Sequence, residues 1–389
     1  MINDRSDFHP HYSCTQEINE FYWFTAIRGL AIGLVGIFLP IYVFLYFNRS
    51  VEMAAIFYLV QFLGAGLLAP IMAKLVSRGG IKRTLMWSNP ILGIYVLFLI
   101  LAKYWGITAI ILAIAFKIIY LTSFWIAHDI YFSKFSENGK RGKEMGNVNI
   151  ISLIVNSMAP FAGGFGIVWF GFAPVFVVSV ILLTVSSFPL FYSPEVREVF
   201  SLNWKGVYKK AFNRRNLRNT IIFMFRGMEL GAGLLLLPIF VYIVIENLET
   251  IGWITSLSLF LLVGVSYYVG KENDHWGSKK VMSITSILHG ISWVGIVFIK
   301  TPLHYFFYRT LLGLAGLANG ISYGSLLYKR AYETGSGVDE YVTMYTVAHS
   351  LGRAMFFLLV AIGFYLGFQS FLFYFALAGV GAFATRFLK

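Results

Sequence analysis

Twelve long apolar runs, separated by short polar stretches, dominate the hydrophobic pattern of the chain. Each run supplies the roughly 20 mainly apolar residues that a helix needs to cross the hydrocarbon core of a bilayer. Short segments of alternating polarity, which are typical of outer-membrane strands, are absent from the sequence. The pattern predicts an all-α membrane protein with spans at about 22–47, 53–76, 84–102, 106–131, 146–170, 173–192, 219–245, 251–269, 281–299, 302–327, 342–366 and 369–387.

The composition supports this class. Of the 389 residues, 58% are hydrophobic and 13% are charged, whereas about a quarter of the residues in a soluble domain are charged. The single cysteine, Cys14, excludes a disulfide or a cysteine-built metal site within one chain. Residues 1–21 are polar and lack the basic start and apolar core of a secretory signal, so we expect them to form a cytoplasmic tail.

The net charge of +13 is distributed unevenly over the predicted loops. Lys and Arg gather in the turns after even-numbered spans, while the other turns hold only Arg49, Lys103 and Lys300. Cytoplasmic loops carry this excess, so both termini are predicted inside the plasma (inner) membrane. The cations are spread over separate loops rather than one soluble face, which predicts contact with membrane lipids and no nucleic acid.

One long polar interruption, residues 193–218, divides the spans into two sets of six. Its Trp, Tyr, Phe and Val residues alternate with cations, as in an amphipathic helix that lies on the inner leaflet. We therefore predict an N-terminal six-helix bundle over 22–192 and a C-terminal bundle over 219–389.

The two predicted bundles share an internal repeat. "RGLAIGLVGIFLPIYV" from Arg28 aligns with "RGMELGAGLLLLPIFV" from Arg226. The turn "AKLVSRGGIKR" aligns with the turn after span 8 at nearly the same offset, so that Ser77 meets Asp274. Two agreeing signals predict tandem halves, related by an axis along the membrane normal.

The turn after span 8 contains Gly270, Asp274, His275, Gly277 and Lys279. This spacing resembles the loop signature of the major facilitator superfamily: glycine, three residues, acid, base, any residue, glycine, then two bases. The copy after span 2 is degraded, with Ser77 in place of the acid. The resemblance covers essentially the whole chain through its topology and implies two pseudo-symmetric six-helix bundles that rock about a central site.

Two further segments are similar to motifs of this superfamily. "RTLLGLAGLANG", which begins at Arg309, resembles its arginine-led motif. In span 4 only Lys117 corresponds to that arginine. "MAPFAGG", residues 158–164, resembles the end of a motif that exporters carry in span 5.

The resemblance also implies a gating latch made of Ser77, Arg78, Gly270, Asp274, Gly277 and Lys279. A small loop acid can accept hydrogen bonds from the exposed N–H groups at a helix start. Asp274 is expected to cap span 5 near 144–148, and Ser77 to cap span 11 near 339–343. The alternative is that these are ordinary residues of positively charged inner loops.

Five cations lie within predicted spans and away from the span ends: Arg28, Lys117, Arg226, Arg309 and Arg353. Ionisable residues inside a membrane are costly and usually mark functional sites. The resemblance places the first four on helices that line the central cavity, so we take Arg28, Lys117, Arg226 and Arg309 as candidate substrate-binding residues. Alternatively, Arg28 and Arg226 extend to the nearby interface, and Arg226 is neutralised by an acid one turn away.

That acid, Glu229, is the first candidate for proton coupling, because a membrane-buried carboxyl group can change its charge during a transport cycle. Asp129, near the inner end of span 4, is the second. Buried histidines at 289 and 349 are more typical of hydrogen bonds between helices.

These features predict a secondary transporter of a small molecule that works by alternating access and exports its substrate with proton coupling. An organic-anion carrier or antiporter is one alternative, and a lipid flippase or receptor without ion coupling is another. The sequence has neither the His-Glu-x-x-His zinc motif nor the Gly-x-Ser-x-Gly elbow, so we predict no enzyme activity. We expect a monomer without a cofactor or metal.

Overall fold

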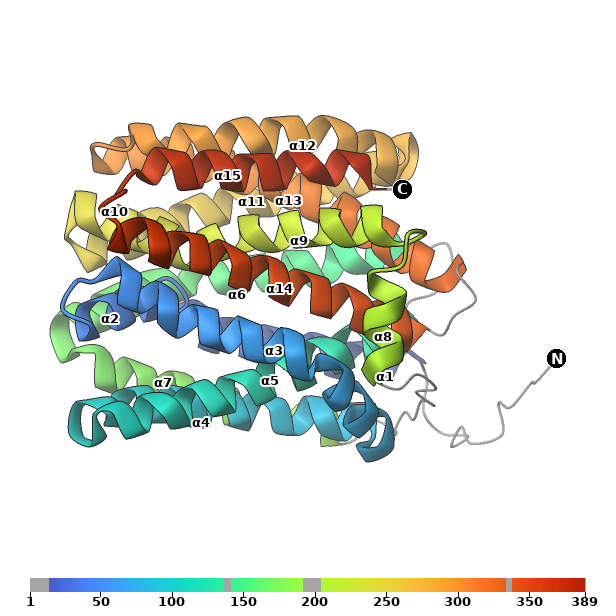
Figure 1. The fold of residues 1–389 in the computed structure, drawn as a ribbon, viewed down its shortest axis with the longest axis horizontal. Helices are drawn as coiled ribbons and strands as arrows, with labels where there is room; N and C mark the ends of the chain where they lie inside the picture. The colour runs from blue at the N-terminus through green and yellow to red at the C-terminus, as the bar shows by residue number, and fades with distance from the viewer. Residues whose placement is uncertain (1–13, 136–140, 192–203, 334–337, 389) are drawn as a thin grey trace.

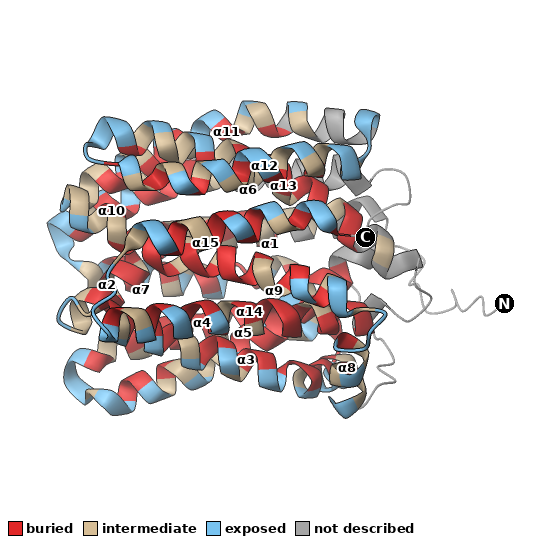
Figure 2. Ribbon diagram, turned by 45° about the horizontal axis from the view of Figure 1, so that its top comes forward, coloured by how far each residue is buried: buried red, intermediate tan, exposed pale blue. Residues whose placement is uncertain are grey.

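The chain folds into a bundle of long helices that run side by side (Figure 1). The computed structural model describes residues 14–135, 141–191, 204–333 and 338–388. Within these ranges it contains helices and no strands, which confirms the predicted all-α class. Many of the exposed residues are large and apolar. Figure 2 shows that buried and exposed positions occur together along the same helices. Such a surface is suited to contact with lipid tails rather than water.

The helices before the linker are α1 (Cys14–Val35), α2 (Phe38–Tyr46), α3 (Val51–Gly79), α4 (Ile81–Trp105), α5 (Ile107–Phe135), α6 (Arg141–Phe170), α7 (Phe172–Val185) and η1 (Phe188–Phe191). The linker contains α8 (Trp204–Ala211). After it come α9 (Leu217–Gly231), η2 (Ala232–Leu236), α10 (Leu237–Ile245), α11 (Leu248–Trp276), α12 (Ser278–Gly295), η3 (Ile296–Phe298), α13 (Pro302–Glu333), α14 (Val338–Tyr365), α15 (Phe371–Ala384) and η4 (Thr385–Phe387).

The predicted spans correspond to helices in the structure. Among the described residues, ten helical segments are long and apolar enough to cross a membrane. Two shorter apolar segments, Ile154–Phe170 and Phe371–Phe387, coincide with the predicted spans 5 and 12. The exact number of twelve spans stays a prediction.

Helix packing follows the sequence repeat. In the first half α1 packs on α6 and α7, and in the second half α9 packs on α14 and α15. The two sets meet mainly through α3 against α14 and α6 against α11. This arrangement leaves α1, α5, α9 and α14 around the middle of the molecule, where a cavity of about 520 Å³ lies. The bounds of the two bundles themselves stay a prediction.

Glycines allow the closest of these helix contacts. A Cβ at Gly227 in α9 would meet the His349 carbonyl oxygen, and one at Gly352 in α14 would meet the Met224 carbonyl oxygen. Between the halves, Gly252 of α11 approaches the Pro160 carbonyl oxygen of α6 in the same way. Without a hydrophobic force between helices in lipid, small residues that admit dense backbone packing supply much of the association energy.

The first and seventh spans are both interrupted at equivalent positions. The first breaks between α1 and α2, and the seventh contains the π-helical turn η2 before α10. Pro40 and Pro238 follow these interruptions, and each lacks the N–H that would bond to the carbonyl four residues earlier, at Gly36 and Leu234. The shared proline therefore explains why both helices bend where they pass the central cavity.

The two aligned turns of the repeat share an unusual backbone conformation. Gly80 has φ/ψ of 96°/140° and Gly277 has 81°/134°. A residue with a Cβ rarely adopts such positive φ angles, so glycine is required at both tight turns. The alignment of these two glycines in the sequence is thus matched by their geometry.

The linker contains the predicted helix, but α8 packs against protein. Val207 and Ala211 are buried, and Figure 1 shows α8 lying across α3 and α14. The Tyr208 hydroxyl reaches the backbone carbonyl oxygens of Gly66 (2.8 Å) and Leu67 (3.0 Å) in α3. Burial raises the pKa of Tyr208 and so keeps its hydroxyl protonated as a donor.

Candidate functional site

A cavity of about 520 Å³ lies in the middle of the helix bundle. Its wall is mostly apolar and aromatic, with contributions from helices of both halves, including α1, α3, α5, α9 and α14. Four charged residues also line it: Arg28, Lys117, Glu229 and Arg353. Its size falls within the roughly 300–1,000 Å³ that is usual for small-molecule sites.

Two smaller cavities border the central one. A cavity of about 470 Å³ contains His128, Asp129, Arg226 and His349, and shares Arg353 with the central cavity. A cavity of about 300 Å³ is lined by Asn156, Thr255 and Arg309 and shares Gly36 and Leu234 with the central cavity. The bends of the first and seventh spans therefore form the partition between the central cavity and the one at Arg309.

Arg28 is held by neighbours of its own half. Its Nε donates to Asn89 Oδ1 (3.2 Å), its Nη2 donates to the Tyr120 hydroxyl, and its guanidinium lies 3.8 Å from the Phe124 ring centre. Asn89 is itself oriented by donation to Ser186 Oγ (2.7 Å). These contacts fix the position of Arg28 on the cavity wall and occupy part of its donor capacity.

Lys117 is less constrained. Its ammonium group lies 4.7 Å from the ring centre of Tyr95 and 4.9 Å from that of Tyr120. Arg353 lies in a similar setting, 5.0 Å above the Phe62 ring. Aromatic faces stabilise a cation only partly. In the portions of the chain that the structure describes, neither cation forms an ion pair with an acid.

Arg226 and Glu229 form a buried ion pair. Arg226 Nη1 lies 2.8 Å from Glu229 Oε2, one helical turn away, and the residues are only 8% and 4% exposed. Glu229 Oε1 also accepts from Trp293 Nε1 (3.1 Å) and lies 3.5 Å from His289 Nε2. The structure therefore contains the alternative considered from the sequence, in which Glu229 neutralises Arg226. Arg28 and Arg226, although equivalent in the repeat, have different partners.

The second proton-coupling candidate, Asp129, lies in the 470 Å³ cavity and not in the central one. Its Oδ1 is 3.0 Å from Nδ1 of His128. In the same cavity, His349 Nε2 is 3.2 Å from the Tyr323 hydroxyl, and the His349 ring is tilted by 45° against that of Tyr345, with 4.1 Å between centroids. The structure thus separates the two acids, placing them in adjoining cavities.

The latch residues lie at the ends of α3, α11 and α12. Ser77 donates to the Lys74 carbonyl oxygen (2.9 Å) within its own helix, while Arg78 and Lys279 are exposed. The side chain of Asp274 and the surroundings of Gly270 lie outside the described residues, as do the side chains at 144–148. The capping roles of Asp274 and Ser77 stay predictions.

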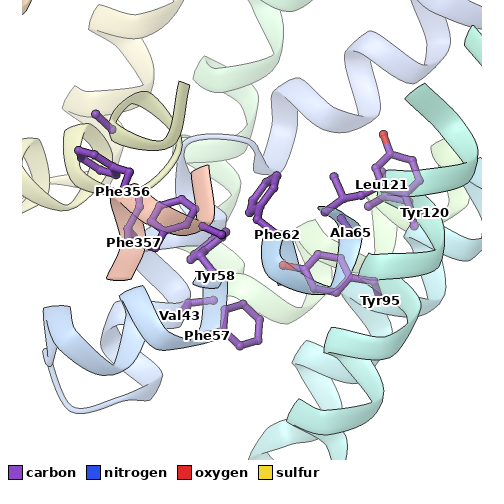
Figure 3. Packing of buried hydrophobic residues seen from close by; sticks show 14 of the residues in the cluster. Val43, Phe57, Tyr58, Phe62, Ala65, Tyr95, Tyr120, Leu121, Phe356 and Phe357 are labelled. Atoms are coloured by element: carbon purple, nitrogen blue, oxygen red, sulfur yellow. The ribbon is translucent and has the colours of Figure 1, made fainter. Parts of the chain in front are cut away.

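Arg353 and the aromatic residues of the cavity were missing from the candidate binding set. The sequence marked Arg353 as a cation within a span, but the family resemblance favoured other helices. Tyr120, one helical turn after Lys117, could have been found from that spacing. Tyr58 and Tyr95 could not, because they lie on other helices and reach the cavity only through packing. Figure 3 shows Tyr95 extending from its helix toward the helix that carries Tyr58 and Phe62.

Comparison with known proteins supports the architecture. The profile of the Major Facilitator Superfamily matches residues 21–356. The chain belongs to this superfamily. A multidrug-resistance efflux pump PmrA homolog of Lactococcus lactis subsp. lactis (strain IL1403) is 23% identical over 318 residues, covering 77% of each chain.

Two solved superfamily structures share the fold. A mutant of the nucleoside transporter NupG superposes with a TM-score of 0.67 at 13% identity, over 95% of this chain and 98% of the other. The human organic anion transporter MFSD10 (TETRAN) superposes with a TM-score of 0.59 at 11% identity, over 96% and 100%. At these identities the likeness concerns the fold. The family match points to a multi-pass membrane transporter rather than an enzyme.

Proposed function

We propose that this protein is a secondary transporter that carries a small amphipathic organic anion by alternating access. The observation that supports the substrate class is the placement of Lys117 and Arg353 on one mainly apolar cavity without an acidic partner among the described residues. An organic anion would supply the missing charge and fill the apolar space.

Electrostatics favour an anion over a cation. Three cations and one acid line the central cavity, and the acid, Glu229, is already paired with Arg226. A buried charge without a partner is costly, and its interaction with an opposite charge strengthens as water is excluded. A cationic substrate would have to displace Arg226 from Glu229 and also approach Lys117 and Arg353.

This assignment changes the roles first expected of the arginines. The sequence offered Arg28 and Arg226 as candidate substrate-binding residues, with extension to the interface and neutralisation by Glu229 as the alternative. In the structure, Arg28 donates to Asn89 and Tyr120, and Arg226 pairs with Glu229. These contacts occupy many of the N–H donors of both arginines and support structural roles for them. We assign the leading contacts with the anion to Lys117 and Arg353, with Arg28 adding charge from the side.

The bent first and seventh spans support alternating access. Gly36 and Leu234, at the two bends, line both the central cavity and the one at Arg309. Helices α2 and α10 contact each other beyond the bends. Rocking of the two halves would change this contact and the partition, with both termini in the cytoplasm.

Export coupled to protons is the second part of the proposal. The efflux pump relative supports the direction, and the position of Glu229 on the cavity wall supports the coupling role. Protonation of Glu229 would release Arg226 from its ion pair and so alter the charge that the substrate meets. In proteoliposomes, the Glu229→Gln variant should still bind the substrate but lose transport driven by a pH gradient.

The experiment that tests the substrate class is ligand stabilisation of the purified protein. A ligand that binds only the folded state raises the apparent thermal stability. Aryl phosphates and aryl carboxylates should stabilise the wild type, and quaternary aryl ammonium ions of the same size should not. Stabilisation by the ammonium ions alone would refute the anion assignment.

A further inference from the structure

The inference concerns two tyrosine hydroxyls beside Lys117, and it rests on the proposed anion transport. We propose that the hydroxyls of Tyr58 and Tyr95, together with the ammonium group of Lys117, form the subsite for the oxyanion head group of the substrate. All three residues line the central cavity, and they come from three different helices, α3, α4 and α5.

The hydroxyls of Tyr58 and Tyr95 are buried and unsatisfied. The residues are 1% and 0% exposed, and neither hydroxyl has a hydrogen-bond partner among the residues described. A buried tyrosine of α13 does find a partner: the Tyr305 hydroxyl pairs with that of Thr255 at 2.8 Å. Leaving a buried polar group unpaired is costly, so such groups in a native structure require an explanation. Here both lie on a cavity that also holds an unpaired cation.

The three residues belong to one cavity wall, and Lys117 lies next to Tyr95. The Lys117 ammonium is 4.7 Å from the centre of the Tyr95 ring. Tyr58 and Tyr95 line the same cavity, and Figure 3 shows the Tyr95 hydroxyl directed toward α3, the helix of Tyr58. A head group placed between α3, α4 and α5 could therefore meet all three.

The donor set selects the chemistry of the head group. A tyrosine hydroxyl can donate one hydrogen bond and the lysine ammonium can donate three, and the ammonium accepts none. Carboxylate, phosphate and sulfonate groups offer several acceptor oxygens and a negative charge. A neutral hydroxyl group would satisfy the tyrosines but leave the charge of Lys117 uncompensated. The neighbouring Leu92, Val96 and Leu121 would contact the apolar body of the substrate.

This role predicts opposite effects of phenylalanine substitutions on the free and bound protein. In Tyr58→Phe and Tyr95→Phe the unpaired hydroxyl is removed and the ring is kept, so the free protein should be as stable as the wild type or more stable. Because each hydroxyl would donate to a charged group, anion binding should weaken by about ten- to hundredfold per hydroxyl. A merely structural tyrosine would not combine these two results.

The test measures thermal stability and equilibrium binding with three probes of one shape: naphthyl phosphate, naphthoate and a naphthyl quaternary ammonium ion. The variants are Tyr58→Phe, Tyr95→Phe and Lys117→Gln. Tyr341→Phe is the matched control, because the Tyr341 hydroxyl is also buried and unpaired among the described residues but lies on none of the three cavities.

We expect each anion to bind the wild type and the Tyr341→Phe control with the same affinity. Each anion should bind the three cavity variants more weakly. A stronger effect on the phosphate than on the carboxylate would support a head group with three oxygens, and the reverse would support a carboxylate. If the anions bind all tyrosine variants as tightly as the wild type, while Arg353→Gln abolishes binding, the subsite is wrong and the anion transporter stands. If neither anion binds the wild type, the proposed function fails together with the subsite.

Discussion

The buried pair of Arg226 and Glu229 allows a direct test of whether ion pairing stabilises charged residues inside this protein. Glu229→Gln keeps the size of the side chain and an oxygen that can accept from Trp293, but removes the charge that faces Arg226 at 2.8 Å. Both residues are more than nine-tenths buried, so the unpaired guanidinium of Arg226 would have little contact with water. Breaking a buried pair in this way costs about 3–5 kcal/mol.

The double variant Arg226→Met, Glu229→Gln distinguishes pairing from other effects of the single substitutions. When both charges are removed, no charge of the pair remains to be compensated, so most of the stability should return. Replacement of a whole buried pair by apolar residues is often neutral or stabilising. The two substitutions should therefore be strongly non-additive, with the double variant losing less stability than either single variant.

Thermal unfolding of the four proteins in one neutral detergent provides the assay, with Gly264→Ala as a control on a glycine that faces open space. Both single variants should unfold at lower temperatures than the double variant. If the double variant is as unstable as the sum of the two singles, the charges act independently. The ion pair would then not be the reason that Arg226 is tolerated in the bundle.

Three further predictions concern packing, the linker and the orientation of Arg28. Gly352→Leu should prevent folding or strongly lower thermal stability, because its Cβ would strike a backbone carbonyl of α9; near-normal stability would contradict the assigned helix contact. The Lys210–Glu340 pair (2.7 Å) joins α8 to α14, so Lys210→Glu should slow transport, measured as flux into proteoliposomes, and the added Glu340→Lys should restore it; no rescue would argue against the pair. Asn89→Leu should leave Arg28 Nε without its acceptor, and it should weaken anion binding by less than Lys117→Gln does. If a binding assay shows an equal or greater loss of affinity in Asn89→Leu, Arg28 is the main contact with the anion.

The local features of this protein could be predicted from its sequence. The length and hydrophobicity of each run set the spans, since every backbone group in lipid must bond within its own helix. The glycines at 80 and 277 could be paired by alignment because the backbone conformation that requires glycine is also local. The bends at Pro40 and Pro238 follow from the missing N–H of proline.

The roles of the buried charges could not be read in this way. The sequence supplied five cations in spans and away from the span ends, but the rotation of each helix and the identity of its neighbours decide which of them face the cavity. Arg28 and Arg226 occupy equivalent positions in the repeat, yet one lies beside Asn89 and Tyr120 and the other beside Glu229. Tyr58 and Tyr95 join Lys117 only because α3, α4 and α5 pack around the same space. The length of an apolar run is a property of one segment, so the sequence alone determines it. The energy of a buried charge depends instead on partners that only tertiary packing brings together.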